Sequence, residues 1–194
     1  FAINDGEYKV MGLSSFGNPN SKSAKLVRNL MDWDDINNKL ISEMSYFDYH
    51  ISTSNSYSSK LEDLLGPARN PFIPLVPGDR DFQRCADIAK GAQDLTIYLL
   101  GKIFTHAHKL TNSSRFLFSG GVSLNSASID SLAQLSFVDE IIIPPSPGDA
   151  GCAIGAAFYC YIKSNSSKDL NISQPSLFPS AIEKRNDELL TEKI

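Results

Sequence analysis

Residues 115–157 read RFLFSGGVSLNSASIDSLAQLSFVDEIIIPPSPGDAGCAIGAA, and the rest of the chain is organised around this stretch. It holds two short apolar runs, residues 116–118 and 141–143. Each run leads into a glycine-bearing turn, residues 119–121 and 147–151, and then into a predicted helix. A strand–turn–helix unit that occurs twice predicts an α/β fold in which both turns lie at one edge of a sheet.

Length, composition and charge limit the class of protein. The 194 residues allow one hydrophobic core with a small appendage, and 42% hydrophobic and 21% charged residues are ordinary for a soluble globular protein. The net charge of −4 argues against a general nucleic-acid binder. No run approaches the roughly 18 apolar residues that a membrane span needs. We therefore expect a cytoplasmic protein with no nucleic-acid or membrane partner.

The cysteines and histidines show no spacing typical of a metal site. Cys85, Cys152 and Cys160 are an odd number of cysteines on apolar helical faces, which predicts reduced, buried thiols. His106 and His108 stand two residues apart on a predicted helix, so their side chains point about 200° apart and cannot share a metal. We expect neither histidine to be catalytic.

Outside the opening stretch, the pattern of apolar residues predicts mainly helices. We expect irregular structure in residues 1–20, a strand at 44–51, a loop at 52–59 and a serine-rich linker from residue 164 onward. The predicted helices span residues 21–33, 60–65, 79–110 and 181–193. The domain is therefore expected to end near residue 164. Phe1 stands where a complete chain has Met, which suggests an excised fragment.

The first turn of the opening stretch is a candidate anion site. Gly120 and Gly121 let backbone N–H groups approach a ligand without interference from a Cβ. The helix predicted at residues 123–135 points its positive N-terminal end at the same place. Asn125 lies in the first turn of that helix and can hydrogen-bond a ribose, a base or a phosphate. The alternative is a tight strand-to-helix turn without a ligand.

The second turn carries a carboxylate. Asp149 follows the prolines that end the strand and opens a predicted helix of small residues, where Asp is most often an N-cap. A capping carboxylate keeps one oxygen that can bind a hard or borderline metal cation, so the two roles are compatible. Ligands of α/β sheets bind at the edge where both turns are predicted to lie. The residues alone therefore suggest a nucleotide together with a metal.

Five motifs resemble the NodU/CmcH-type O-carbamoyltransferase family and occur in the order that the family has. They are residues 7–13 (EYKVMGL), 66–69 (GPAR), 88–93 (IAKGAQ), 119–125 (SGGVSLN) and 144–157 (PPSPGDAGCAIGAA). The resemblance covers residues 1–163 and leaves residues 164–194 as a linker or tail toward a further domain. It implies the second half of an actin/Hsp70/sugar-kinase-like (ribonuclease H-like) catalytic domain, a mixed sheet with flanking helices.

The resemblance also implies the chemistry. In this family, carbamoyl phosphate and ATP give carbamoyl adenylate in a YrdC-like domain. The carbamoyl group then passes to a hydroxyl of a sugar or antibiotic-like acceptor beside a bound Fe2+. By motif position, Asp149 would be a metal ligand. Gly120, Gly121 and Asn125 would contact the adenosine phosphate and ribose, and Glu7, Lys9 and Gly12 would line the nucleotide cleft from the other side.

The resemblance places several parts of the enzyme outside this chain. The family's other metal ligands, two histidines four residues apart, would lie upstream of Phe1, as would the phosphate-binding first half of the fold. The YrdC-like domain would lie elsewhere, so we expect this chain to be unable to complete the reaction alone. Two alternatives stay open. One is a kinase- or ATPase-like nucleotide-binding domain of the same superfold, and the other is a non-catalytic remnant that binds a partner chain or dimerises.

Overall fold

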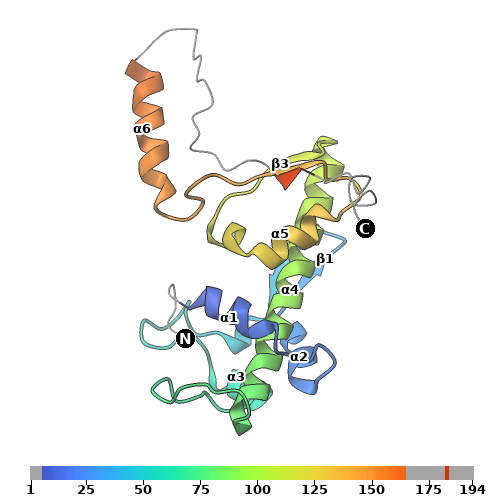
Figure 1. Cartoon of the computed structure of the whole chain (residues 1–194), viewed down its shortest axis with the longest axis vertical. Helices are drawn as coiled ribbons and strands as arrows, with labels where there is room; N and C mark the ends of the chain where they lie inside the picture. Colours follow the sequence, from blue (N-terminus) through green and yellow to red (C-terminus); the bar gives the residue numbers. More distant parts are fainter. Residues whose placement is uncertain (1–5, 165–181, 184–194) are drawn as a thin grey trace, which may run out of the picture. The chain divides into compact units, whose positions relative to one another are not determined.

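The computed structural model describes residues 6–164 and 182–183, and the chain divides into two compact units (Figure 1). Unit 1 is Phe1–His106 and unit 2 is Ala107–Ile194. The described residues form helices and two small sheets that are joined by loops, so the predicted mixed α/β class is confirmed. None of the helices in these residues is both long and apolar enough to cross a membrane.

Unit 1 is mainly helical and contains one hairpin. Its elements are α1 (Glu7–Ser14), α2 (Lys22–Leu26), η1 (Val27–Leu30), β1 (Met31–Asp34), β2 (Lys39–Ser42), η2 (Met44–Tyr46), α3 (Ser59–Leu65) and α4 (Arg80–Thr111). The last residues of α4, 107–111, belong to unit 2. Strands β1 and β2 pair antiparallel, with Met31 opposite Ser42 and Asp34 opposite Lys39.

Unit 2 is built on a three-stranded sheet in the order β3-β4-β5. Strands β3 and β4 are parallel and β4 and β5 are antiparallel, so the sheet is mixed. The elements of unit 2 after α4 are β3 (Arg115–Leu117), η3 (Gly121–Leu124), α5 (Ser126–Ala133), β4 (Glu140–Ile142), α6 (Gly151–Ser164) and β5 (Ile182–Glu183).

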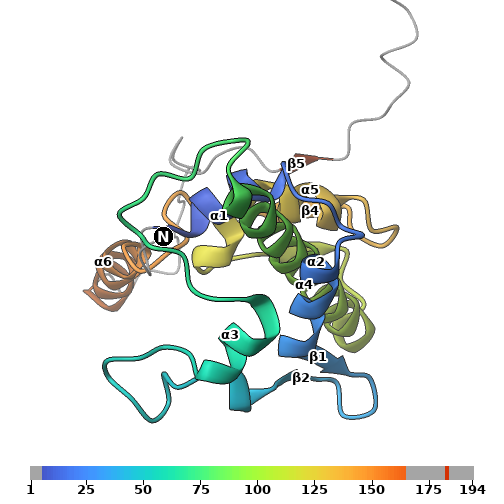
Figure 2. The same cartoon turned by 90° about the horizontal axis from the view of Figure 1, so that it is seen from below.

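The core of unit 1 lies along α4. Val27, Leu95 and Leu99 form a buried cluster, and side chains from β1 and α3 pack against it. Figure 2 shows α2 and β1 beside α4. The partly buried members of the cluster are Leu30, Met31, Trp33, Leu65, Ile88, Ala92 and Tyr98. Burial of an apolar stripe of this kind holds an amphipathic helix in place. The spacing of the apolar residues in the sequence predicted this stripe on α4.

Two glycines allow the N-terminal segment of unit 1 to approach α4 closely. A Cβ added to Gly91 would lie 2.8 Å from the Ala24 Cα and closer still to the Ala24 carbonyl oxygen. A Cβ added to Gly17 would lie 2.8 Å from the Ala86 carbonyl carbon and closer still to its oxygen. Since real Cβ atoms do not approach backbone this closely, glycine is required at both contacts.

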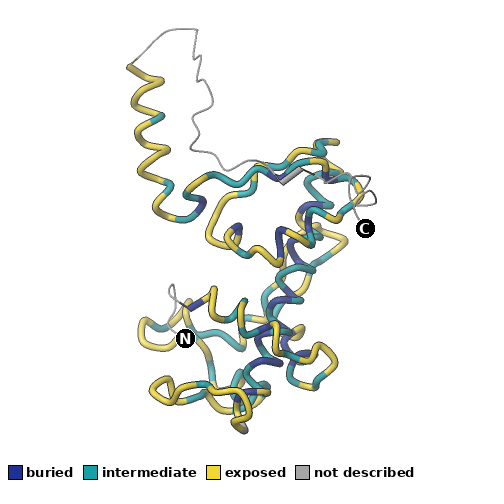
Figure 3. The backbone as a smooth tube through the Cα atoms, viewed as in Figure 1, coloured by how far each residue is buried: buried dark blue, intermediate teal, exposed yellow. Residues whose placement is uncertain are grey.

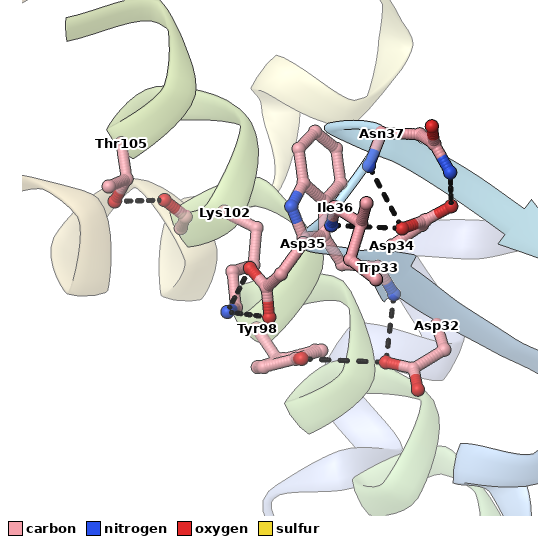
Figure 4. A network of polar contacts seen from close by, with 10 residues as sticks. Asp32, Trp33, Asp34, Asp35, Ile36, Asn37, Tyr98, Lys102 and Thr105 are labelled. Carbon is pink, nitrogen blue, oxygen red and sulfur yellow. Dashed lines mark hydrogen bonds and ion pairs between the residues drawn. The ribbon is translucent and has the colours of Figure 1, made fainter. Parts of the chain in front are cut away.

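Polar contacts tie the hairpin turn to α4 (Figure 4). The Lys102 Nζ donates to both carboxylate oxygens of Asp35, at 2.8 and 3.0 Å, and this hydrogen bond raises the pKa of Lys102. The Tyr98 hydroxyl donates to Asp32 at 3.4 Å. Within the turn, Asp34 accepts from the Asn37 side chain, which lowers the Asp34 pKa. Asp32, Asp35 and Asn37 are exposed, so the ion pair and hydrogen bonds that they make fix the geometry of the turn more than they stabilise the fold.

The sequence located the long helix and α3 correctly but misassigned three segments. Residues 7–14 form α1 although irregular structure was expected, because the glycines at positions 6 and 12 do not interrupt the helix. The helix predicted at 21–33 ends by Leu30, and residues 31–34 form β1 because pairing with β2 places Met31 and Trp33 against the core. Residues 44–51 contain η2 and a single bridge from Phe47 to Tyr57 instead of a strand.

The predictions for the C-terminal region fall largely outside the described residues. Residue 164 is the last residue of α6, so the helix reaches the point where the linker was expected to begin. Residues 182–183 form β5, which contradicts the helix predicted at 181–193 at these two positions. The remainder of that prediction lies outside the described residues.

A buried carboxylate, Asp87, joins α4 to the segment between α1 and α2. Its Oδ1 accepts from the Asn18 backbone N–H at 2.8 Å and from the Gln83 side chain at 2.7 Å. Burial alone would raise the Asp87 pKa, but hydrogen bonds from Asn18, Gln83 and Ser21 outweigh burial and lower it. The folded state therefore favours the ionised carboxylate.

Asp87 should contribute to acid denaturation. A lowered pKa in the folded state stabilises the protein above the unfolded-state pKa of about 3.9, and this stability is lost as the pH falls through the folded pKa. We expect Asp87→Asn to lower the free energy of unfolding by roughly 1–3 kcal/mol at pH 7 and to flatten the dependence below pH ~4. Urea denaturation between pH 2.5 and 7 measures both effects. Asp63→Asn, at an exposed site on α3, is the control, and equal pH profiles for the two variants would contradict this role.

Candidate functional site

The two turns of the opening stretch leave the sheet of unit 2 at the same edge. Strands β3 and β4 are parallel, with Phe116 opposite Ile141 and Leu117 opposite Ile142. The Phe118 N–H extends this ladder by donating to the Ile142 carbonyl at 2.9 Å. The predicted juxtaposition of the two turns is therefore confirmed, and it places them where ligands of parallel sheets commonly bind.

A single carbonyl group joins the two turns. The Pro147 carbonyl oxygen accepts from the Gly120 N–H at 2.7 Å and from the Ser119 Oγ at 3.1 Å. Pro147 itself is buried. Because both turns share this acceptor, the position of the first turn depends directly on the conformation of the second.

The first turn has a conformation that only glycine adopts readily. Gly120 has φ +102° and ψ 159°, outside the region open to other residues. Its carbonyl oxygen accepts from the Ser123 Oγ at 2.7 Å, and Ser123 is 2% exposed. The Gly120 N–H points to Pro147, so the expectation that this N–H faces an anion is wrong. The Cα positions of Gly120 and Gly121 nevertheless border open space, since an added Cβ would meet nothing within 4 Å.

Asn125 has a structural role that the sequence did not reveal. A 3-10 turn, η3, occupies the start of the predicted helix, so α5 begins at Ser126 and Asn125 is its N-cap. The Asn125 Oδ1 accepts from the backbone N–H of the buried Ser128 at 3.0 Å. This capping bond satisfies a helix-terminal donor, and any contact of Asn125 with a nucleotide would be additional to it.

Asp149 is exposed in the second turn and does not cap the following helix. Helix α6 begins two residues later, at Gly151, and the Asp149 side chain makes no hydrogen bond to any residue that the structure describes. The Asp149 backbone carbonyl instead accepts from the Cys152 N–H at 3.1 Å. The predicted cap is therefore wrong, because the turn continues past Asp149 before the helix starts.

The tight geometry of the second turn explains why it contains Gly151. The Gly151 N–H donates to the Gly148 carbonyl at 2.9 Å. A Cβ on Gly151 would lie 3.3 Å from the Ser146 carbonyl carbon and closer still to its oxygen. The chain therefore doubles back on Ser146 before α6 begins, and this fold of the backbone presents Asp149 to solvent.

The described residues supply one candidate metal ligand, not a complete coordination set. Residues 6–164 and 182–183 contain no group of three or more His, Cys, Asp or Glu side chains that could together hold a metal ion. Asp149 offers a carboxylate oxygen of the kind that hard and borderline cations bind. A metal at this point would need further ligands beyond those that the structure brings together.

The other predicted nucleotide residues lie in unit 1. Glu7, Lys9 and Gly12 are exposed on α1, and the Lys9 Nζ lies 5.4 Å from the centre of the Tyr8 ring. The Glu7 carboxylate accepts from the Gly6 N–H at 3.1 Å. The chain divides into two units, and a nucleotide cleft lined by α1 and the two turns stays a prediction.

Histidines and cysteines outside the turns have ordinary surroundings. His106 packs beside Trp33, with ring centres 6.1 Å apart, and His108 stacks on Phe137 at 4.5 Å. The His108 Nδ1 lies 2.8 Å from the Ser113 carbonyl oxygen. All three cysteines are free thiols. The expectation that all three are buried is wrong, since Cys152 and Cys160 are exposed on helix α6 and Cys85 is only half-buried.

Two features of the candidate site were not predicted from the sequence. Ser119 was read only as the first residue of a glycine turn, and Pro147 only as part of the second turn. Their hydrogen bond depends on the register of β3 and β4, which brings the ends of the two strands level. Ser119 lies two residues after the end of β3 and Pro147 five residues after the end of β4, so no common spacing in the sequence pairs them and only the fold brings them together.

Comparison with known proteins gives one family and several curated relatives. Residues 1–158 match the model of the family described as "Carbamoyltransferase N-terminus". The "Uncharacterized protein sll1178" of Synechocystis sp. is 33% identical over 158 residues, which cover 81% of this chain and 24% of that protein. "Nodulation protein NolO" of Bradyrhizobium diazoefficiens is 29% identical over 152 residues, which cover 78% of this chain and 24% of that protein. "Nodulation protein NolNO" of Sinorhizobium fredii is 26% identical over 152 residues, which cover 78% of this chain and 19% of that protein.

These alignments cover most of this chain but only a small part of each relative. The chain spans about a quarter or less of the length of the curated relatives that it matches. Both turns of unit 2 lie within the matched residues.

Proposed function

The chain belongs to the carbamoyltransferase N-terminus family, and on this premise we propose that it contributes the nucleotide-side half of an ATP-dependent O-carbamoyltransferase site. The observation that supports the proposal is the pair of turns joined at the Pro147 carbonyl, at the carboxyl edge of two parallel strands. This is the edge at which α/β sheets place phosphate-bearing ligands. The family and the geometry thus favour the same stretch of the chain.

We propose that the chain is the second half of an actin/Hsp70-like catalytic domain covering residues 1–163. Gly120 and Gly121 would border the phosphate and ribose of the nucleotide, since their open surface leaves room for a ligand. Glu7, Lys9 and Gly12 on α1 would line the opposite side of the nucleotide cleft. The rest of the cleft and a YrdC-like domain would be supplied from outside these residues, in the cytoplasm.

The proposed reaction transfers a carbamoyl group from an activated donor to a hydroxyl. Water would first cleave carbamoyl phosphate to carbamate and inorganic phosphate, and the carbamate oxygen would then displace pyrophosphate from the α-phosphate of ATP to give carbamoyl adenylate. The acceptor oxygen, from a sugar or antibiotic-like molecule, attacks the carbamoyl carbon while the bond to the AMP phosphate oxygen breaks. AMP leaves, and the hydroxyl proton passes to a base or solvent. Charge that develops on the carbonyl oxygen needs a nearby donor or cation.

Bound Fe2+ would supply a Lewis acid to such a site. Asp149 is the residue of this chain that we propose as one of its ligands, because its carboxylate is exposed and makes no hydrogen bond to the described residues. The described residues do not complete a coordination set, so no step of the reaction is assigned to the metal.

The fate of ATP separates carbamoyl transfer from the main alternative, a kinase- or ATPase-like domain. The native gene product that carries this sequence should form pyrophosphate and AMP from ATP, and only when carbamoyl phosphate is added. Ion-exchange chromatography separates AMP from ADP, and a coupled pyrophosphatase assay measures the pyrophosphate. Formation of ADP without any need for carbamoyl phosphate would favour the kinase or ATPase alternative and contradict the proposal.

Asn125 provides a test of nucleotide contact that can be separated from its capping role. We expect Asn125→Ala to weaken ATP affinity about 10-fold, because the amide is lost, and to lower stability by about 1 kcal/mol, because the cap is lost. Asn125→Ser keeps a capping oxygen but not the amide, so it should weaken ATP binding equally without the loss of stability. Isothermal titration calorimetry and thermal unfolding measure the two effects. Parent-like ATP affinity in the serine variant would rule out nucleotide contact by Asn125.

A further inference from the structure

The Ser119 hydroxyl lies at the edge of the sheet where the nucleotide is proposed to bind, yet it is directed at the protein. Its Oγ donates to the Pro147 carbonyl oxygen at 3.1 Å, and the Gly120 N–H donates to the same oxygen at 2.7 Å. A backbone carbonyl oxygen has two lone pairs, so these two donors use its full capacity for hydrogen bonds. The first turn therefore holds the second turn through one backbone group and one side chain.

Pro147 is the buried point of the second turn. Pro145 and Asp149 on either side of it are exposed, and Figure 3 shows this short buried segment in the chain that leads into α6. The proline ring also fixes the backbone φ at this residue, which limits the ways in which the chain can move here. A buried carbonyl group with two donors thus gives the second turn a fixed attachment to the first.

The position of the Asp149 carboxylate follows from this attachment. Asp149 lies two residues after Pro147, inside a tight loop that the Gly151 N–H closes by donating to the Gly148 carbonyl at 2.9 Å. The loop has little room to rearrange, because a Cβ on Gly151 would lie 3.3 Å from the Ser146 carbonyl carbon and closer still to its oxygen. Loosening the attachment at Pro147 would therefore move the whole loop and the carboxylate with it.

We propose, on the basis of the proposed function, that Ser119 is a positioning residue whose hydroxyl holds the Asp149 turn at a fixed place beside the first turn. The hydroxyl has one proton, and donating it to Pro147 leaves none to donate to a phosphate oxygen of the nucleotide. Loss of the hydroxyl should therefore disturb the arrangement of the site more than the affinity for ATP.

Two substitutions separate the hydroxyl from the shape of the side chain. Ser119→Thr keeps a hydroxyl, whereas Ser119→Val has nearly the same branched shape without one. In the ligand-free 194-residue chain we expect the Gly151 amide proton to exchange about 3–10-fold faster in the valine variant than in the threonine variant, because one hydrogen bond of the attachment is lost. Hydrogen exchange followed by nuclear magnetic resonance measures this rate. Ser136→Ala, at an exposed site between α5 and β4, is the control and should exchange like the parent.

An amide of α5 separates a local effect from a loss of global stability. The Ile129 N–H donates to the Asn125 carbonyl at 3.1 Å, and Ile129 is buried. Its exchange rate should be the same in the valine and threonine variants. Equal exchange of the Gly151 amide in these two variants would overturn the proposal, and so would an equal acceleration at Gly151 and Ile129.

Steady-state kinetics of the native gene product that carries this sequence distinguish positioning from contact with ATP. Relative to Ser119→Thr, the valine variant should lower kcat about 3–10-fold and leave the KM for ATP within about 2-fold. A raised KM with unchanged kcat would show that the hydroxyl contacts ATP, which would also overturn the proposal. A parent enzyme that does not cleave ATP in response to carbamoyl phosphate would contradict the proposed function instead. The exchange measurement needs no ligand and would still decide whether Ser119 holds the second turn.

Discussion

Gly91→Ala is expected to destabilise unit 1 by an amount near the top of the roughly 1–3 kcal/mol range typical of overpacked cores. The added Cβ would lie 2.8 Å from the Ala24 Cα and closer to the Ala24 carbonyl oxygen. Both are backbone atoms, so no side-chain rotation relieves the clash. Either α2 moves away from α4, which disturbs the buried Val27 beside it, or α4 itself distorts.

Gly101→Ala is the matched control because it lies in the same helix and has open space around it. An added Cβ at this position meets nothing within 4 Å. Alanine has the higher helix propensity, so this variant should gain up to about 1 kcal/mol. Urea denaturation followed by circular dichroism measures both variants. Opposite signs are expected for the two substitutions, and a stabilised Gly91→Ala would show that α2 does not approach α4 as described.

Asp149→Asn is expected to lower iron affinity about 100-fold or more in the native gene product, and kcat for carbamoyl transfer by about 10²–10³-fold. The amide keeps the size of the side chain but removes the negative charge that a metal ligand supplies. Stability should change by less than about 0.5 kcal/mol, because Asp149 is exposed and makes no hydrogen bond to the described residues. Metal content by mass spectrometry and thermal unfolding give the two readouts.

Asp139→Asn is the control for this substitution. Asp139 is also exposed in unit 2, just before β4. Its substitution by Asn removes the same negative charge from the chain. It should retain parent-like iron content and turnover. Equal iron content in the Asp149 and Asp139 variants would show that Asp149 is not a ligand.

The sequence pattern predicted correctly those elements whose conformation is decided by neighbouring residues in the chain. The apolar stripe of α4 and the glycine that ends α3 were readable directly, and Gly66 indeed has φ +91°. The two strand–turn–helix units were readable as well, because glycine and proline mark both turns. The parallel pairing of β3 and β4 followed from their order along the chain.

Elements that depend on distant contacts could not be predicted in this way. Residues 31–34 continue a helical pattern in sequence, yet they form β1 because pairing with β2 and packing on α4 decide their conformation. The start of α5 shifted to Ser126 because Ser123 bonds back to the Gly120 carbonyl and closes a 3-10 turn first. Tertiary contacts override local propensity at such positions.

The candidate site was likewise predicted in its location but not in its detailed geometry. Its location at the sheet edge was predicted from two turns, whereas the orientation of individual groups was not. Gly120 directs its N–H to Pro147, Asn125 caps α5, and Asp149 stands free of α6. Each of these depends on one hydrogen bond or one extra turn residue, which the residue types alone do not specify.

The shared acceptor at Pro147 also gives unit 2 an intrinsic spectroscopic probe. An amide proton resonance is sensitive to the length of the hydrogen bond that the proton donates, and the Gly120 N–H donates to the Pro147 carbonyl. Any change in the second turn that displaces Pro147 would therefore change the resonance of Gly120, a residue on the other turn. Chemical-shift titration of this one glycine amide can therefore follow events in the second turn without any label there.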